Sequence, residues 1–278
     1  MESIKQFLLK PSTYNTVVGI YATFPVLMIP ALFVVNAPYG RFAGKLGIEC
    51  SLPGKWSWCI MEAVSPIAFG MSIYLTRPTG TPFQIILISA WMAHYINRSI
   101  IHPFRATSLA PVHILAFVSS VGFNLINGYT NGMWVGRHSN SIYSISFWFG
   151  ITLWFTGFVS NIYHDNILFK LRTKKKEKEK NDEKQQGFND AKERPVKKHY
   201  FIPYGGLFEY VSCANYFSEA MEWLGFTLAT QMQSTPAIIF TLSTMANLFP
   251  RAWRTNAWYK EKFDDYPPER KAVLPFIL

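Results

Sequence analysis

Ionisable side chains recur at helical spacing inside several long apolar stretches of this chain. Tyr95, Arg98 and His102 stand at i, i+3 and i+7, which places them on one face of a helix. Asn161 and Asp165 stand one turn apart on another stretch. Ionisable groups are expensive inside a membrane and usually mark a functional site, although a lone Asn or Tyr often only joins two helices.

Two more apolar stretches carry similar polar faces. Asn215, Glu219 and Glu222 stand at i, i+4 and i+7, and Trp58 precedes Glu62 by one turn. A buried carboxyl group costs free energy, so Glu62 and Glu219 are the strongest candidates for a functional role. An apolar pocket would also favour a protonated Glu62 at neutral pH, and a protonated carboxyl group is a hydrogen-bond donor.

Seven apolar stretches are long enough to cross a bilayer, which takes about 20 residues. Only backbone that satisfies its own hydrogen bonds crosses lipid, so we expect an all-α integral membrane bundle in a single domain. Asn131-Gly132 is one of several expected turns between the spans. The predicted spans are 15–36, 57–76, 82–101, 108–128, 144–169, 206–231 and 235–251.

Composition supports a membrane protein and limits the other classes. Of the 278 residues, 49% are hydrophobic and only 16% are charged, against about 25% in average soluble domains. The tract 170–198 holds twelve of the basic and six of the acidic residues, so we expect a disordered charged loop. This tract lacks a nucleic-acid-binding module, and membrane lipids are its expected partner. Cys50, Cys59 and Cys213 are too scattered for a metal site or a disulfide framework.

Lysine and arginine set the expected orientation. Arg41 and Lys45 fall between the first two spans, and the tract 170–198 follows the fifth, whereas the alternate loops are nearly free of positive charge. Positive loops stay in the cytosol, so the C-terminus is expected there. All polar faces then meet in the cytosolic half of the bundle, where they would line one large polar cavity. The membrane would be the endoplasmic reticulum in a eukaryote and the inner membrane in a bacterium.

No known soluble-enzyme signature is present, including GxSxG, HExxH, the P-loop and GxGxxG. A dinucleotide would therefore have to bind without a Rossmann fold. Fixed positive charge for its phosphates is available at the cytosolic end of the bundle. The arginines there are Arg98, Arg105, Arg172 and Arg251.

Several sequence blocks resemble the steroid 5α-reductase family. They are Tyr39-Gly40-Arg41-Phe42, WCIME around Glu62, HYINR at 94–98, LFKLR at 168–172, FIPYGGLFEYVSCANYFSEAMEW at 201–223 and the tail FDDYPPERKAVLPFIL at 263–278. The resemblance runs from about residue 38 to the C-terminus, and GGLFEYVSCANY is its most specific part. It implies a seven-helix membrane enzyme that uses NADPH to reduce the C4–C5 double bond of a 3-oxo-Δ4 steroid. In place of a histidine common in the family's tail, this chain has Thr255.

The resemblance also implies roles for individual residues. Glu62 and Tyr95 would be catalytic and hydrogen-bond the 3-keto oxygen, with Trp58 beside the substrate. The steroid would enter from the lipid phase, and no obligate protein partner is expected. The implied cofactor site comprises Arg98, Arg105, Asn161, Asp165, Arg172, Asn215, Glu219, Arg251 and Tyr259.

Two other functions remain open at this point. Related reductases act on enoyl-CoA or polyprenol-type substrates, and a seven-helix transporter or receptor without chemistry would also carry polar groups at mid-membrane. A cluster of arginines and amides at one mouth suits a dinucleotide better than a small ion.

Overall fold

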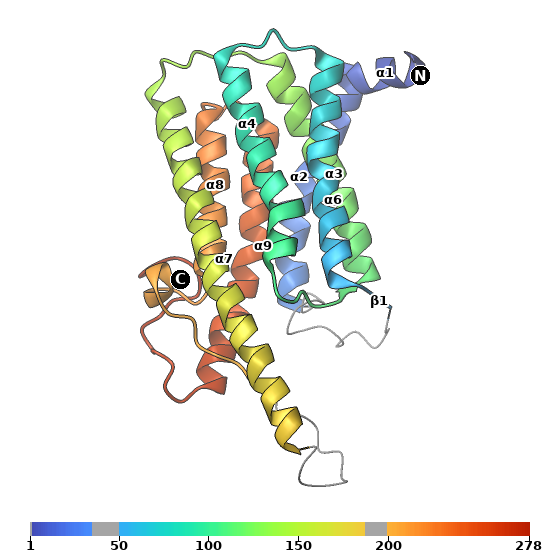
Figure 1. Ribbon diagram of the computed structural model, residues 1–278. Helices are drawn as coiled ribbons and strands as arrows, with labels where there is room; N and C mark the ends of the chain where they lie inside the picture. Colours follow the sequence, from blue (N-terminus) through green and yellow to red (C-terminus); the bar gives the residue numbers. More distant parts are fainter. Residues whose placement is uncertain (1, 35–49, 187–198) are drawn as a thin grey trace.

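The computed structural model describes residues 2–34, 50–186 and 199–278. Long helices lie side by side and alternate in direction, so the connections between them lie in turn at one end of the bundle and then at the other (Figure 1). Arg41, Lys45 and the block Tyr39–Phe42, which entered the sequence argument, lie outside the described residues. The helices are α1 (Glu2–Leu9), α2 (Pro11–Val34), α3 (Gly54–Thr76), α4 (Pro82–Ile96), α5 (His102–Arg105), α6 (Ile114–Arg137), α7 (Ile145–Gln186), α8 (Ala214–Ala229) and α9 (Thr235–Lys262).

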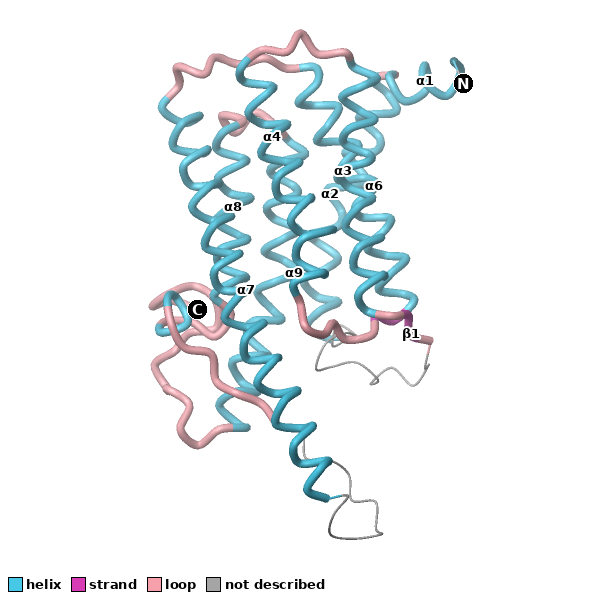
Figure 2. Tube along the Cα trace, viewed as in Figure 1, coloured by secondary structure: helices cyan, strands magenta, loops and turns pink. Residues whose placement is uncertain are grey.

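Short irregular pieces complete the described chain (Figure 2). A π-helical segment, η2 (Asn97–Ile101), joins α4 to α5, and a 3-10 turn, η3 (Gly206–Glu209), precedes α8. The two-residue strands β1 (Ser51–Leu52) and β2 (Val112–His113) pair antiparallel at one end of the bundle. The all-α prediction is therefore confirmed.

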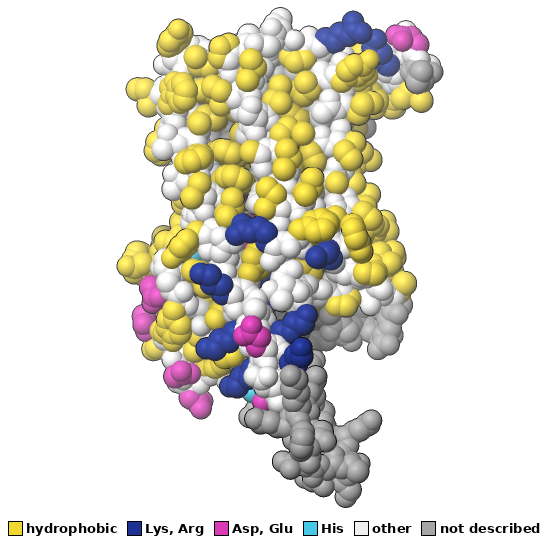
Figure 3. All heavy atoms as spheres, in the orientation of Figure 1, with side chains coloured by type: hydrophobic (Ala, Val, Ile, Leu, Met, Phe, Trp, Pro, Cys, Tyr) yellow, Lys and Arg dark blue, Asp and Glu magenta, His cyan; other side chains and the backbone are white. Residues whose placement is uncertain are grey.

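Two described helices, α3 and residues Ile145–Asp182 of α7, are long and apolar enough to cross a membrane by length and composition. The outer surface over α3, α4 and α7 is largely hydrophobic, and most charged side chains on this face gather near the lower end of α7 (Figure 3). Ile67, Tyr74 and Phe155 are among the large apolar side chains that remain exposed there. That seven helices cross the membrane stays a prediction.

The charged tract differs from the expected loop. The α7 helix continues through it as far as Gln186, and residues 187–198 lie outside the described part. Lys175 and Glu179 form an i,i+4 ion pair of 3.8 Å, and the ammonium of Lys175 lies 4.2 Å from the ring centroid of Tyr200. The returning chain also bonds to this helix, since His199 Nε2 lies 2.6 Å from Asp182 Oδ2. Helix-forming lysines and glutamates with these contacts favour a helix over a loop.

The expected turn at Asn131-Gly132 is also wrong, because α6 runs without a break to Arg137. Gly132 packs against α3, where an added Cβ would come within 2.7 Å of the Phe69 carbonyl oxygen. One turn away on either side, Gly128 approaches the α3 backbone at Ser65 and Gly136 approaches the side chain of Thr76. These glycines thus serve close helix packing, as small residues do in membrane bundles.

The predicted boundaries of the last two spans shift as well. Gly205 and Gly206 both have positive φ, of 99° and 58°, so the chain from 206 to 213 is not an α-helix and α8 begins only at Ala214. Helix α9 continues past Arg251 to Lys262. This end of the bundle is therefore built from irregular chain and helix extensions as well as from the long helices.

Replacing Gly132 by Ala is expected to destabilise the protein, while replacing Gly122 by Ala on the same helix is expected to be tolerated. A Cβ at Gly132 meets backbone of α3, and a Cβ at Gly122 has nothing within 4 Å. Overpacking of this kind costs about 1–3 kcal/mol. Thermal unfolding of the two purified variants in detergent measures the difference. Equal melting temperatures would contradict the proposed α3–α6 packing.

Candidate active site

Arg98 lies at the centre of a polar cluster where α3, α7 and α8 meet the segment η2. Its guanidinium stands 3.7 Å from Asp165 Oδ2 on α7 and 3.7 Å from Glu219 Oε2 on α8. It also lies 4.9 Å from the ring centroid of Trp58 on α3, and the Trp58 indole donates a 3.0 Å hydrogen bond to the Arg98 carbonyl. Four segments of the chain are thus joined by one arginine.

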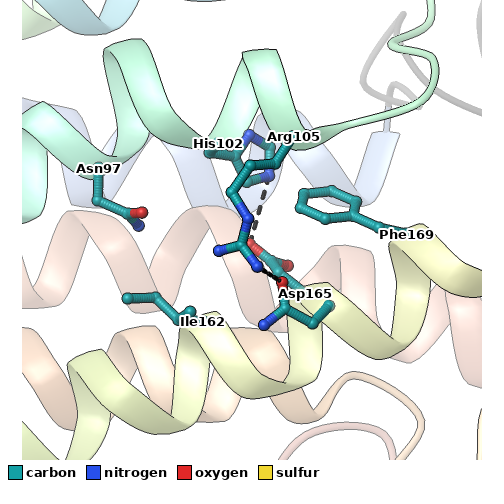
Figure 4. A pocket seen from close by; sticks show the side chains of 7 residues that line it. Asn97, His102, Arg105, Ile162, Asp165 and Phe169 are labelled. Carbon is teal, nitrogen blue, oxygen red and sulfur yellow. Dashed lines mark hydrogen bonds and ion pairs between the residues drawn. The ribbon is translucent and has the colours of Figure 1, made fainter.

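Asp165 connects this arginine to the amides of α7 and α8. Its Oδ1 accepts a 3.0 Å hydrogen bond from Asn215 Nδ2, and its Oδ2 lies 3.3 Å from His102 Nε2. Asn161, one turn earlier, donates a 2.9 Å hydrogen bond to the Asn215 carbonyl. The contact of His102 with Asp165 is seen in Figure 4, where both flank a small cavity.

The π-helical segment explains how His102 reaches Asp165. Pro103 has no backbone N–H and cannot continue regular helical hydrogen bonding to the Ser99 carbonyl. The wider turn at Asn97–Ile101 accommodates this break and re-aims the residues that follow. The ring of His102 then stacks on Trp58, with ring centroids 5.5 Å apart.

Tyr95 and Glu62 lie next to this cluster, deeper in the bundle. Tyr95 is buried to 2% exposure, and its phenol oxygen accepts a 2.8 Å hydrogen bond from Asn127 on α6. Glu62 on α3 is partly buried and interacts electrostatically with Arg98 and Glu219. Tyr95 and Glu62 interact with each other in the same way. The two residues predicted to act on one oxygen are therefore neighbours from different helices.

A buried pair joins α4 to α8 beside Tyr95. His94 Nδ1 lies 2.7 Å from Glu222 Oε1, and both side chains are almost fully buried. The His94 ring packs edge-on against Tyr95 and Trp223, with ring centroids 5.0 and 4.4 Å away. Sequence spacing does not indicate His94 as a site residue, although it precedes Tyr95 and lies one turn before Arg98. Spacing indicates Glu222 only as a member of the polar face that it shares with Asn215 and Glu219.

Arg105 and Arg172 lie further out, toward the charged end of α7. Arg105 is hydrogen-bonded to Asn166 Oδ1, and Arg172 donates a 3.4 Å hydrogen bond to the Ser108 carbonyl. A cleft of about 490 Å³ opens beside Arg105 and carries three cationic side chains. It is lined by Arg105, Thr107, Asn166, Phe169, Lys170, Thr173, Lys174 and Glu177. It shares Arg105, Asn166 and Phe169 with the small cavity at Asp165.

Arg251 and Tyr259 belong to the part of α9 that is packed by the C-terminal tail. The Arg251 guanidinium lies 5.3 Å from the ring centroid of Tyr216, and the Tyr259 ring stacks on Tyr266 at 5.2 Å. Tyr266 itself hydrogen-bonds Ser212, and burial raises the pKa of this phenol above its usual value. The tail thus anchors this half of the predicted cofactor site.

A fully buried arginine fastens the same tail to the chain before α8. Arg270 donates a 2.8 Å hydrogen bond to the Pro203 carbonyl and lies 3.5 Å from Glu209. His164 holds the start of η3, because its Nε2 accepts a 2.9 Å hydrogen bond from the Leu207 N–H. These contacts give a structural role to His164 and to the block 201–223, whose helix starts later than predicted.

The structure therefore brings most of the predicted site residues together at one end of the bundle. In place of an open polar cavity, however, the innermost side chains contact one another directly. The reason is charge: several carboxyl groups surround Arg98, and buried charges are stabilised by pairing. The residues joined in this way are Trp58, Arg98, Asn161, Asp165, Asn215 and Glu219, with His102 added.

Comparison with known proteins identifies close relatives. The family model described as 3-oxo-5-alpha-steroid 4-dehydrogenase matches residues 110–189 and 184–278. The chain is 30% identical to 3-oxo-5-alpha-steroid 4-dehydrogenase 1 of Bos taurus over the full length of both proteins. It is 36% identical to the steroid 5-alpha-reductase DET2 of Gossypium hirsutum, over 92% of this chain and 95% of that protein. An uncharacterized protein of Schizosaccharomyces pombe is 34% identical over 95% of this chain and 99% of its own.

Proposed function

This chain belongs to the 3-oxo-5α-steroid 4-dehydrogenase family, whose members are steroid-reducing oxidoreductases, and from that premise we propose that it reduces the Δ4 double bond of a 3-oxo-Δ4 steroid with NADPH. The observation that carries the proposal is the position of Tyr95 and Glu62, which come from two helices and interact electrostatically beside the Arg98 cluster. The product is the 5α-dihydro steroid.

The two side chains have the chemistry that this reduction requires. Hydride addition at C5 moves negative charge onto the 3-oxygen of the steroid, which then resembles an enolate. Tyr95 donates one hydrogen bond to that oxygen, and a protonated Glu62 donates the second. Donors fixed in place where charge develops are worth most in a buried site that excludes water. A proton transferred from water to C4 completes the reduction.

The residues around Asp165 fit a pyridine dinucleotide. Asp165, Asn161 and Asn215 offer fixed acceptors and donors, and the adjoining cleft of about 490 Å³ carries Arg105 among its cations. A cleft of this size and charge suits a phosphate-bearing ligand. His102 Nδ1 is buried without a hydrogen-bond partner among the described residues. This nitrogen is therefore available to hydrogen-bond a ligand bound near Asp165. NADPH, when bound, supplies the hydride. The proposed set of cofactor-binding residues is completed by Arg98, Arg172, Glu219, Arg251 and Tyr259.

The outer surface suggests how the ligands reach this site. The apolar faces of α3 and α7 suit contact with lipid, so the steroid enters from the membrane. The charged end of the bundle lies in the cytosol, together with the C-terminus, and admits the cofactor. A seven-span protein in this orientation would lie in the endoplasmic reticulum of a eukaryote or in the inner membrane of a bacterium.

Product analysis with purified protein tests the proposed reaction. The protein is incubated with NADPH and, separately, with testosterone, progesterone, an enoyl-CoA and a polyprenal. We expect 5α-reduced steroid and NADPH consumption in equal amounts. Reduction of the enoyl-CoA or the polyprenal, with no steroid product, would assign the chain to another reaction of related reductases.

Replacing Asn215 or Arg172 by Ala is expected to weaken NADPH binding first. Asn215 holds Asp165 in place, and Arg172 contributes positive charge at the outer end of the site. Hydrogen bonds to charged groups are worth about 1.5–3 kcal/mol, so the Kd should rise by about one to two orders of magnitude. Fluorescence titration with NADPH measures the Kd. The single-turnover rate at saturating NADPH should change much less, and a rate loss without a change in Kd would contradict the assignment.

A further inference from the structure

A chain of buried amides on α6 ends at the phenol of Tyr95. Asn127 is fully buried, and its Nδ2 donates the 2.8 Å hydrogen bond to the Tyr95 oxygen. The Oδ1 of Asn127 accepts from the Tyr21 hydroxyl at 2.8 Å and from Asn131 Nδ2 at 3.0 Å. Tyr21 comes from α2, so three helices meet at this amide.

A backbone carbonyl fixes which end of each amide group faces its neighbour. Asn131 Nδ2 also donates a 3.1 Å hydrogen bond to the Asn127 carbonyl oxygen, which can only accept. Asn131 must therefore present its NH2 group to Asn127. A reversed Asn127 would place two NH2 groups against each other, so its Oδ1 faces Asn131 and its Nδ2 faces Tyr95.

The orientation of Asn127 limits where the hydroxyl hydrogen of Tyr95 can point. Its oxygen accepts from Asn127, so its hydrogen has to point elsewhere. On the α3 side the phenol has a side-chain hydrogen-bond interaction with Ser65 and an electrostatic interaction with Glu62. The hydrogen therefore points toward the α3 side of the phenol, where Ser65 and Glu62 lie.

We propose that Asn127 is a positioning residue, oriented by Asn131, that turns the hydroxyl hydrogen of Tyr95 toward the substrate oxygen. The inference rests on the proposed function, in which Tyr95 donates to the 3-oxo group. Asn127 also stabilises the phenol oxygen, which becomes more negative as it shares its hydrogen with the developing enolate. Hydrogen bonds in such a chain strengthen one another.

The test compares Asn127→Leu with a matched control, Asn124→Leu. Asn124 lies one turn earlier on α6 and is buried to a similar extent. It donates a 2.8 Å hydrogen bond to the Met61 carbonyl, and among the described residues no hydrogen bond joins it to Tyr95. We expect Asn127→Leu to lower the single-turnover rate about tenfold, as the loss of one such hydrogen bond would. The KM for the steroid and the Kd for NADPH should change little. Asn124→Leu should keep a rate close to that of the wild type, even if its melting temperature falls.

A double variant separates positioning from a general structural role. In the Tyr95→Phe background there is no hydroxyl to orient, so adding Asn127→Leu should cost no further rate. An equal loss in both backgrounds, or a wild-type rate for Asn127→Leu, would overturn the inference. If Asn127→Leu does not fold, Asn131→Leu is tested instead. Without Asn131, the Asn127 amide can adopt both orientations, and with equal populations the rate should fall about twofold in the enzyme that has Tyr95. The rate should not fall in the Tyr95→Phe enzyme.

Failure of the proposed function gives a different result. A Tyr95→Phe enzyme that reduces the steroid at the wild-type rate would remove Tyr95 from the chemistry, and the role of Asn127 with it. A slow Tyr95→Phe enzyme combined with a fast Asn127→Leu enzyme would overturn the positioning role alone.

Discussion

Replacing Tyr95 by Phe is expected to lower the single-turnover rate by about 10²–10³-fold, the usual cost of one lost donor to a developing oxyanion. The phenol is buried among Trp91, His94 and Trp223, so the phenylalanine ring keeps the same packing and loses only the hydroxyl. The hydrogen bond strengthens as charge builds on the steroid oxygen, so its loss appears in the rate and hardly in substrate binding.

Glu62 variants supply the second half of this experiment. Glu62→Gln keeps a hydrogen-bond donor of nearly the same shape and should retain more activity than Glu62→Ala. Both measurements are paired with the NADPH Kd, which should stay near the wild-type value because neither side chain is assigned to the cofactor. Loss of NADPH binding in Tyr95→Phe, with normal turnover at saturating cofactor, would show that the cofactor and substrate regions are assigned wrongly.

Replacing Arg98 by Leu is expected to destabilise the protein by about 3–5 kcal/mol, the typical cost of removing one partner from a buried ion pair. Its guanidinium is 13% exposed and faces the carboxylates of Asp165 and Glu219, which are 8% and 15% exposed. Without Arg98, these charges remain buried at one end of the bundle. Thermal unfolding in detergent should show a large decrease in the melting temperature.

Charge neutralisation provides the control for this second prediction. Removing the charge of Glu219 together with that of Arg98, as in Arg98→Leu with Glu219→Gln, should restore part of the lost stability. Arg98→Lys should lie between the wild type and Arg98→Leu, because an ammonium keeps the charge but not the planar group stacked on Trp58. If Glu219→Gln lowered the melting temperature of Arg98→Leu further, pairing with the carboxylates would not be the role of Arg98.

Sequence patterns alone predict the class of protein and name most residues of the candidate site. Apolar stretches of helical length with polar groups one turn apart predict helices whose polar faces must meet, because ionisable groups avoid lipid. This reasoning predicts Glu62, Tyr95, Arg98 and Asp165 as site residues, and the structure places them near one another. It works because helical spacing is local, so residues three or four apart share a face whatever the rest of the fold does.

How those polar faces meet depends on contacts between residues far apart in the sequence. The contacts of His94 with Glu222 and of Tyr95 with Asn127 join residues 128 and 32 positions apart, and nothing in local spacing selects such partners. Asn131-Gly132 illustrates the same limit: the pair has turn chemistry, yet α3 packs so closely on it that a continuous helix with a glycine at the contact is favoured. The wide turn at Asn97–Ile101 likewise places His102 on Asp165 across the bundle. Long-range packing and the pairing of buried charges therefore set the final geometry of the site.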